Sequence, residues 1–124
     1  MQFENIIKQN PEFIRIMDNP SVELCILAVT LIPDELLYIK NQTHEICLEA
    51  IKQNYRALQH VRNQTNEICM EAVKRSHKAL PYVNVINKTI DIYLEAIKTN
   101  VNAITLIDEE TRLDVRLKCS ARLA

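Results

Sequence analysis

Apolar residues recur in the middle of the chain with the spacing of an α-helix. In the segment 45–58, EICLEAIKQNYRAL, they follow an i, i+1, i+4, i+5 pattern, which places them on one helical face. They are Ile46, Cys47, Ala50 and Ile51. Thr43 stands just before the segment, where its hydroxyl oxygen can accept from the first-turn amides. The pattern therefore predicts an amphipathic helix that is capped by Thr43.

The same segment recurs along the chain at intervals of 22 residues, so that Glu45 aligns with Glu67. Residues 67–80 read EICMEAVKRSHKAL, and residues 91–104 read DIYLEAIKTNVNAI after an insertion of two residues. Weaker copies precede these, and the last residues resemble the start of another copy. We therefore interpret the chain as one helical-repeat domain, 1–124. Its units are 1–22, 23–44, 45–66, 67–90 and 91–113, followed by a terminal helix over 114–124.

Each unit also predicts a second, shorter helix after the first. The first helix stops at Asn54, Ser76 or Asn100, and the second then presents two apolar residues, Leu58 and Val61 in the copy 45–66. The equivalent pairs are Ile14 and Met17, Leu36 and Ile39, Leu80 and Val83, and Ile104 and Ile107.

Capping and proline residues set the expected helix boundaries. Pro11 and Pro33 fit the first turn of a second helix, whereas Pro81 falls inside one. We expect a distortion at Pro81 unless that helix starts late, near Lys78. The predicted N-caps of the first helices are Ser21, Thr43, Thr65, Thr89 and Thr111.

A helix pair of this length buries its apolar stripe only against neighbouring pairs. The predicted fold class is therefore all-α, an α-solenoid of about five stacked helix-turn-helix repeats plus the terminal helix.

The chain contains no glycine. Glycine-dependent phosphate loops, dinucleotide-binding turns and nucleophile elbows are therefore excluded. Many helices end with a glycine in the left-handed backbone conformation. Without glycine another residue must adopt this conformation, and asparagine tolerates it best after glycine. We therefore expect positive φ at or beside Asn10, Asn54 and Asn100, and an ordinary short turn at Ser76.

Fifteen basic and sixteen acidic residues give a net charge of −1, so no strong overall field attracts nucleic acid or an anionic membrane. No apolar run has the length of a membrane span, and the first residues do not resemble a signal peptide. We expect a cytoplasmic protein without membrane association.

The motif LEAIKQN…AL at 48–58, with its copies MEAVKRS…AL at 70–80 and LEAIKTN…AI at 94–104, resembles a known family. These are the short helical repeats of unknown function found in mimivirus-like giant viruses and amoeba-associated bacteria. The resemblance covers nearly the whole chain and implies a viral source, in which case the cytoplasm is that of the host cell. A glycine that commonly follows Gln-Asn in the family is absent here. The family implies no activity or catalytic residues.

Three cysteines, Cys25, Cys47 and Cys69, share one repeat position. Their spacing lacks the paired ligands of a zinc site, and the next copy holds Tyr93 there, which indicates a packing position. We expect buried thiols that react slowly. His44, His60 and His77 lie at unrelated positions of the repeat, and their spacing indicates no catalytic dyad or triad. We therefore predict a protein that is not an enzyme and that binds no metal or cofactor.

Glutamate and lysine recur three residues apart on the first helices, which places them on one exposed face. We interpret this face either as simply solvated or as a candidate partner-binding surface. Its residues are Glu49, Lys52, Gln53, Glu71, Lys74, Arg75, Glu95 and Lys98.

The pattern favours a non-catalytic module for protein–protein interaction, with an unknown viral or host protein as its partner. One alternative is a repeat protein that binds single-stranded RNA, although matched charges and few aromatic residues disfavour nucleic acid. A second alternative is self-association as a homo-oligomer through the terminal repeats. The surface expected to self-associate is an apolar stripe on the terminal helix, which consists of Val115, Leu117, Cys119 and Ala121.

Overall fold

The computed structural model describes the backbone of residues 2–123 and the side chains of residues 3–118. Within this range the chain is all-α and contains no strand, as the sequence predicts. No helix in it is long and apolar enough to cross a membrane. The chain divides into two compact units, Met1–Asn63 and Gln64–Ala124.

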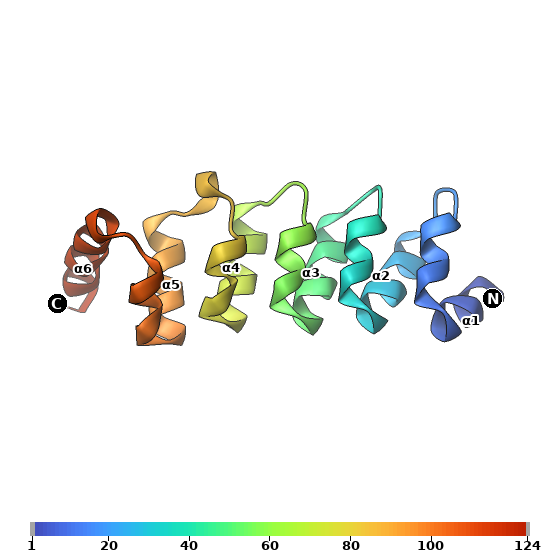
Figure 1. Cartoon of the computed structure of the whole chain (residues 1–124), viewed down its shortest axis with the longest axis horizontal. Coiled ribbons are helices and arrows are strands. Elements are labelled where there is room, and N and C mark those ends of the chain that lie inside the picture. The colour runs from blue at the N-terminus through green and yellow to red at the C-terminus, as the bar shows by residue number, and fades with distance from the viewer. Residues whose placement is uncertain (1, 124) are drawn as a thin grey trace. The chain divides into compact units, whose positions relative to one another are not determined.

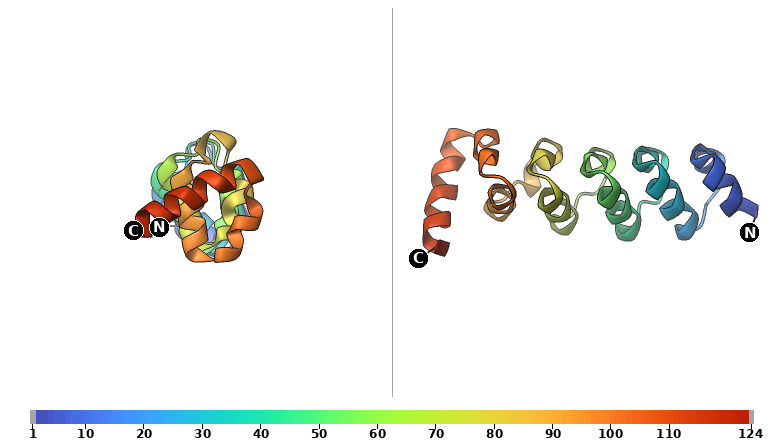
Figure 2. Two further views of the ribbon diagram at one scale, coloured as in Figure 1. Left: turned by 90° about the vertical axis from the view of Figure 1, so that its left-hand side faces the viewer. Right: turned by 90° about the horizontal axis from the view of Figure 1, so that it is seen from below.

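Unit 1 consists of three pairs, each formed by an α-helix and a following 3-10 helix. These are α1 (Gln2–Gln9) with η1 (Pro11–Ile16), α2 (Val22–Leu31) with η2 (Pro33–Tyr38), and α3 (His44–Gln53) with η3 (Tyr55–His60). The α-helices pack against one another in one row and the 3-10 helices in a second row (Figures 1 and 2). The core lies between the two rows.

Unit 2 repeats this arrangement with one addition. Its elements are α4 (Asn66–Arg75), η4 (His77–Tyr82), η5 (Val85–Asn87), α5 (Ile90–Thr99), η6 (Val101–Leu106) and α6 (Glu109–Leu123). Helix α5 packs between α4 and α6, and η4 contacts η6. The short helix η5 lies between η4 and α5, in the segment where the sequence carries its two-residue insertion.

The predicted apolar stripes form the core. Ile46, Cys47, Ala50 and Ile51 of α3 are all at most 2% exposed, and the matching residues of α4 are equally buried. In α5 the stripe is buried except for Ile97, which is half-buried. The second helices contribute Leu36, Leu58 and Leu80, as predicted.

The junction between the two helices of a pair differs from the expectation. Asn10, Asn54 and Asn100 have φ values of −146°, −157° and −157°, so the prediction of positive φ at or beside them is wrong. Asn54 and Asn100 adopt the same extended backbone as Ser76, whereas Asn10 combines its negative φ with a ψ of 83°. One extended residue ends the α-helix and starts the 3-10 helix. The side chains of Asn54, Ser76 and Asn100 accept from the backbone N–H two residues later.

The chain therefore turns at these junctions without any left-handed residue. Within residues 2–123, positive φ occurs outside the junctions, at Asn19 with φ 51° in the loop before α2. Asparagine is the residue that adopts this conformation at least cost after glycine. The absence of glycine follows from extended junctions and from this one asparagine.

Pro81 does not distort its helix, which corrects a second expectation. Helix η4 begins at His77 and ends at Tyr82, the positions equivalent to the bounds of η3. Proline disrupts an α-helix because its ring clashes with the carbonyl four residues earlier. Here the four residues before Pro81 already form a 3-10 helix, which is tighter than an α-helix. Pro81 itself is exposed.

Four of the predicted N-caps are confirmed, and the fifth is wrong. Ser21, Thr43, Thr65 and Thr89 each accept from the amide three residues later, at 3.2 or 3.3 Å. Before α6 the cap is Asp108, whose carboxylate accepts from the N–H of Thr111 at 2.7 Å and from its hydroxyl at 2.9 Å. These hydrogen bonds lower the pKa of Asp108. The terminal helix therefore begins at Glu109, before the predicted residue 114.

Candidate partner-binding surface

Some of the charged residues predicted as a binding face form ion pairs within their own helices, in α3 and α4. In α3 the Lys52 ammonium lies 3.2 Å from the Glu49 carboxylate, and Gln53 beside them is exposed. Such exposed pairs contribute a few tenths of a kcal/mol to helix stability. In unit 1 this part of the predicted face is therefore a solvated helix side with locally paired charges.

In unit 2 the predicted face spans two neighbouring helices. In α4 the Arg75 guanidinium, rather than the Lys74 ammonium, lies 3.1 Å from the Glu71 carboxylate. Glu95 is half-buried and Lys98 is exposed on α5, which packs beside α4. The structure thus places Glu71, Lys74 and Arg75 on α4, and Glu95 and Lys98 on the adjacent helix α5. That a partner binds this face stays a prediction.

Sequence reasoning missed a glutamine that joins neighbouring repeats. The side-chain nitrogen of Gln42 donates to the carbonyl of Leu36 in η2 and to the carbonyl of His60 in η3, both at 2.9 Å. Its side-chain oxygen accepts from the N–H of Arg62 at 3.0 Å. We call this arrangement the glutamine bracket. It ties the ends of two consecutive 3-10 helices together with one side chain.

Gln64 repeats two of these three contacts within unit 2. It donates to the Tyr82 carbonyl and accepts from the Asn84 N–H, both at 2.8 Å. The thiol of Cys69 also points to its side-chain oxygen, at 3.4 Å. The recurrence of Gln42 and Gln64 in the Asn-Gln-Thr turns was the available sequence signal. The role of these glutamines could not be read from that signal, because their hydrogen-bond partners lie 18 and 20 positions away in the chain.

A buried carboxylate in η2 is the second feature that the sequence did not indicate. Glu35 is 1% exposed and accepts two hydrogen bonds from Arg15 of η1, at 2.9 and 2.7 Å. These bonds raise the pKa of Arg15 above its ordinary value. The same guanidinium lies 3.9 Å from the centre of the Tyr38 ring. Arg15 is therefore held between a carboxylate and an aromatic face.

Exposed apolar side chains gather on the same two helices. Ile16 of η1 is 74% exposed, and Leu37 and Tyr38 of η2 are 49% and 46% exposed. In the described range α3, α4 and α5 carry no exposed large apolar side chain, whereas α1, α2, η5, η6 and α6 each carry one or two. Single exposed apolar residues are ordinary, but a group on adjacent elements is typical of an interaction surface. We refer to Arg15, Ile16, Leu37 and Tyr38 as the η1–η2 surface.

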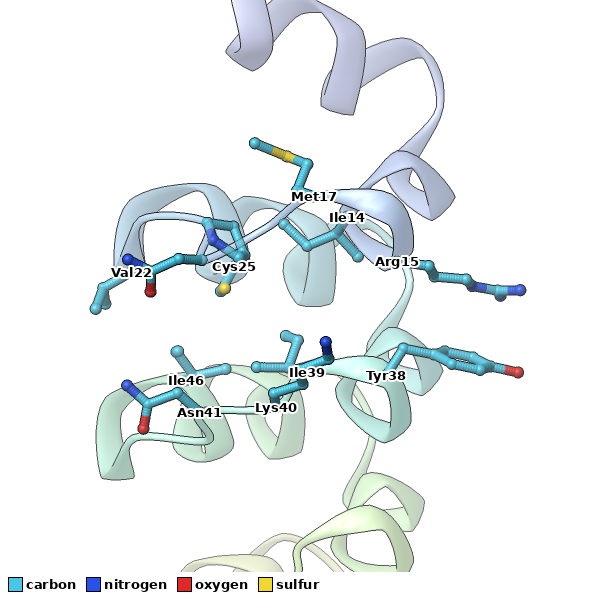
Figure 3. A pocket seen from close by; sticks show the side chains of 12 residues that line it. Ile14, Arg15, Met17, Val22, Cys25, Tyr38, Ile39, Lys40, Asn41 and Ile46 are labelled. Carbon is cyan, nitrogen blue, oxygen red and sulfur yellow. The ribbon is translucent and has the colours of Figure 1, made fainter.

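A cavity of about 80 Å³ lies between the first two repeats. Figure 3 shows residues of the η1–α2 segment facing residues that follow η2 across it. Its polar lining includes Asn19, Lys40 and Asn41, and its apolar lining includes Met17 and Ile39.

The three repeated cysteines are buried free thiols, as predicted. Desolvation raises the pKa of Cys25, Cys47 and Cys69, the last to about 11. Thiolate is the reactive form, so these cysteines are poor nucleophiles at neutral pH. That they react slowly stays a prediction. Burial also raises the pKa of Tyr93, which fills the equivalent position in α5.

The apolar stripe predicted on the terminal helix is not continuous. Val115 is fully buried within unit 2, whereas Leu117 is 62% exposed. The side chains of Cys119 and Ala121 lie outside the described residues. The described residues contain no group of three or more His, Cys, Asp or Glu that could hold a metal ion.

The repeated α/3-10 pairs define an all-α helical-repeat protein. The family described as "Domain of unknown function (DUF4116)" matches residues 43–86 and again 65–112, and the chain belongs to this family. The match covers more than half of the chain and coincides with its most regular repeats. No curated protein and no solved structure matches the chain.

Proposed function

We propose that this protein is a non-catalytic module that binds a protein partner through the η1–η2 surface. The observation that supports this most is Arg15, which is stacked on the exposed ring of Tyr38 and anchored by the buried Glu35. Tyrosine and arginine are enriched at the energetic centres of protein interfaces. Because this pair is already ordered, little side-chain entropy is lost when a partner covers it.

The partner's chemistry follows from the surface. Ile16 and Leu37 offer apolar contact area, and the Tyr38 ring offers both an apolar face and a hydroxyl. The Arg15 guanidinium is already engaged by a carboxylate, so net charge contributes little to recognition. A protein segment with apolar side chains fits this surface best.

The family resemblance supports two further parts of the proposal. We infer that the protein comes from a giant virus or an amoeba-associated bacterium, and that a viral protein acts in the host-cell cytoplasm. The partner is then a viral or a host protein.

The test is affinity purification from the natural host cell with quantitative mass spectrometry. A specific partner should be captured by the wild type and lost with Tyr38→Ala. The matched control is Leu106→Ala in η6, which truncates a side chain of similar exposure in unit 2, 49% against 46% for Tyr38. A partner that is retained by Tyr38→Ala contradicts the proposed surface.

Two further measurements separate the alternatives. A variant with Lys52, Lys74 and Lys98 all changed to glutamate loses the partner only if the charged face binds it. Tight, salt-sensitive binding of labelled single-stranded RNA would replace the protein partner with nucleic acid. Light scattering across a concentration series reports self-association.

A further inference from the structure

The glutamine bracket is missing at the first repeat junction of unit 1. Pro20 occupies the position of Gln42 and Gln64 in the repeat, and its ring has no hydrogen-bonding group. The register identifies the backbone groups that a glutamine would meet there. They are the carbonyls of Ile14 and Tyr38, equivalent to those of Leu36 and His60, and the N–H of Lys40, equivalent to that of Arg62.

The cavity of about 80 Å³ is located where that glutamine side chain would lie. Pro20, Ile14, Tyr38 and Lys40 all line it, and Figure 3 labels the last three. One buried water needs roughly 10–15 Å³ of such space, so the three heavy atoms of an amide group fit. Met17 and Ile39 provide apolar walls for an attached methylene.

We propose that this cavity binds a primary carboxamide, supplied by a glutamine side chain of the protein partner. The amide nitrogen donates to the carbonyls of Ile14 and Tyr38, and the amide oxygen accepts from the N–H of Lys40. This repeats the contacts that Gln42 makes at 2.9, 2.9 and 3.0 Å one repeat later.

The position between the two carbonyls favours an amide over an acid. A carboxylate is an acceptor only and would face two backbone carbonyls without a donor between them. A site whose polar groups are left unpaired by an analogue rejects that analogue strongly.

The origin of the amide in a partner rests on the proposed function, but the binding of a small carboxamide does not. Propionamide has the end of a glutamine side chain and is therefore the probe. In an NMR titration of the ¹⁵N-labelled full chain, propionamide should shift the amide of Lys40 and its neighbours saturably, whereas propionate should not. Equal shifts with both compounds, or none with propionamide, would overturn the site.

Substitutions at residue 20 provide the matched test. Pro20→Gln places a glutamine in the cavity, so it should abolish the propionamide shifts and raise the melting temperature. Pro20→Ala removes the ring without filling the cavity and should retain the shifts. Propionamide binding that persists unchanged in Pro20→Gln contradicts the proposal.

The same variants separate the site from its ligand's source. If Pro20→Gln loses both propionamide binding and the captured partner, the partner supplies the amide. If only propionamide binding is lost, the assignment to a partner glutamine is overturned, and the amide is a free small molecule. If no partner is captured at all, the proposed function is contradicted. The propionamide titration alone then tests whether the cavity binds a carboxamide.

Discussion

Glu35 accepts hydrogen bonds of 2.9 and 2.7 Å from Arg15 at a position that alanine fills in the three following repeats. Ala57, Ala79 and Ala103 are all buried there without a polar partner. The repeat therefore folds without this ion pair, but removing Arg15 and removing Glu35 have different consequences. Removing the arginine leaves a buried carboxylate unpaired, whereas removing the glutamate leaves an arginine that can reach water.

We predict that Arg15→Ala lowers the melting temperature by more than Glu35→Ala does. The double variant should recover most of the loss, because alanine suits this position. A thermal double-mutant cycle followed by circular dichroism measures all four proteins. A double variant that is as unstable as Arg15→Ala would contradict the unpaired-carboxylate explanation.

Removing the glutamine bracket should destabilise the protein measurably. Gln42→Ala removes the side-chain partner of the half-buried His60 carbonyl and of the exposed Arg62 N–H, and one of two partners of the buried Leu36 carbonyl. The expected cost is about 1–3 kcal/mol in the free energy of unfolding. Gln42→Glu should cost more, since a carboxylate cannot donate to the carbonyls of Leu36 and His60. Urea unfolding gives the values. Gln59→Ala, at an exposed position of η3, is the control and should change the free energy by less than about 0.5 kcal/mol.

The extended junctions predict how the chain responds to glycine. Asn54→Gly should lower the free energy of unfolding by roughly 0.5–1 kcal/mol, because it adds chain entropy to the unfolded state and removes the cap on the Arg56 amide. Asn54→Ser should be nearly neutral, since Ser76 fulfils this role in the next repeat. Chemical denaturation compares the two variants.

Asn19 is the matched position at which glycine should be tolerated. Its φ of 51° lies in the left-handed region, so Asn19→Gly should retain full stability, whereas Asn19→Ala should cost about 1 kcal/mol. If Asn54→Gly proved stabilising instead, the junction would have to be left-handed in solution.

The buried thiols predict a loss of stability at alkaline pH. The folded state raises the pKa of Cys69 from 9.0 to about 11, so it favours the neutral thiol. The contribution to stability is complete below pH 9 and is lost as the pH rises towards 11. Urea unfolding of the wild type should therefore weaken more steeply between pH 9 and pH 11 than that of Cys69→Ala. Equal slopes would contradict this account.

Thiol accessibility gives a second measurement on the same residues. At pH 8, a disulfide reagent should react slowly with Cys25, Cys47 and Cys69 in the native protein and rapidly after unfolding in urea. A Cys119→Ser background restricts the signal to these three. Fast reaction of the native thiols would contradict their burial.

The sequence by itself determined the repeat, the helices and their core faces, because these depend on spacing within one segment. The stripe from Ile46 to Ile51 and the caps Ser21, Thr43, Thr65 and Thr89 follow from the period of an α-helix and from the chemistry of a hydroxyl beside free amides. The absence of glycine can likewise be read directly from the sequence. Its interpretation as left-handed asparagines was wrong, because an extended residue also closes the helix end.

The tertiary structure alone decided which side chains act between repeats. Gln42 and Gln64 are turn residues in the sequence, and Glu35 is one of two adjacent acidic residues in an otherwise apolar segment. Their hydrogen-bond partners lie 18 to 20 residues away, so they meet only after neighbouring pairs have packed. The cavity beside Pro20 exists for the same reason, since a missing side chain leaves a space only where the packed repeats define one.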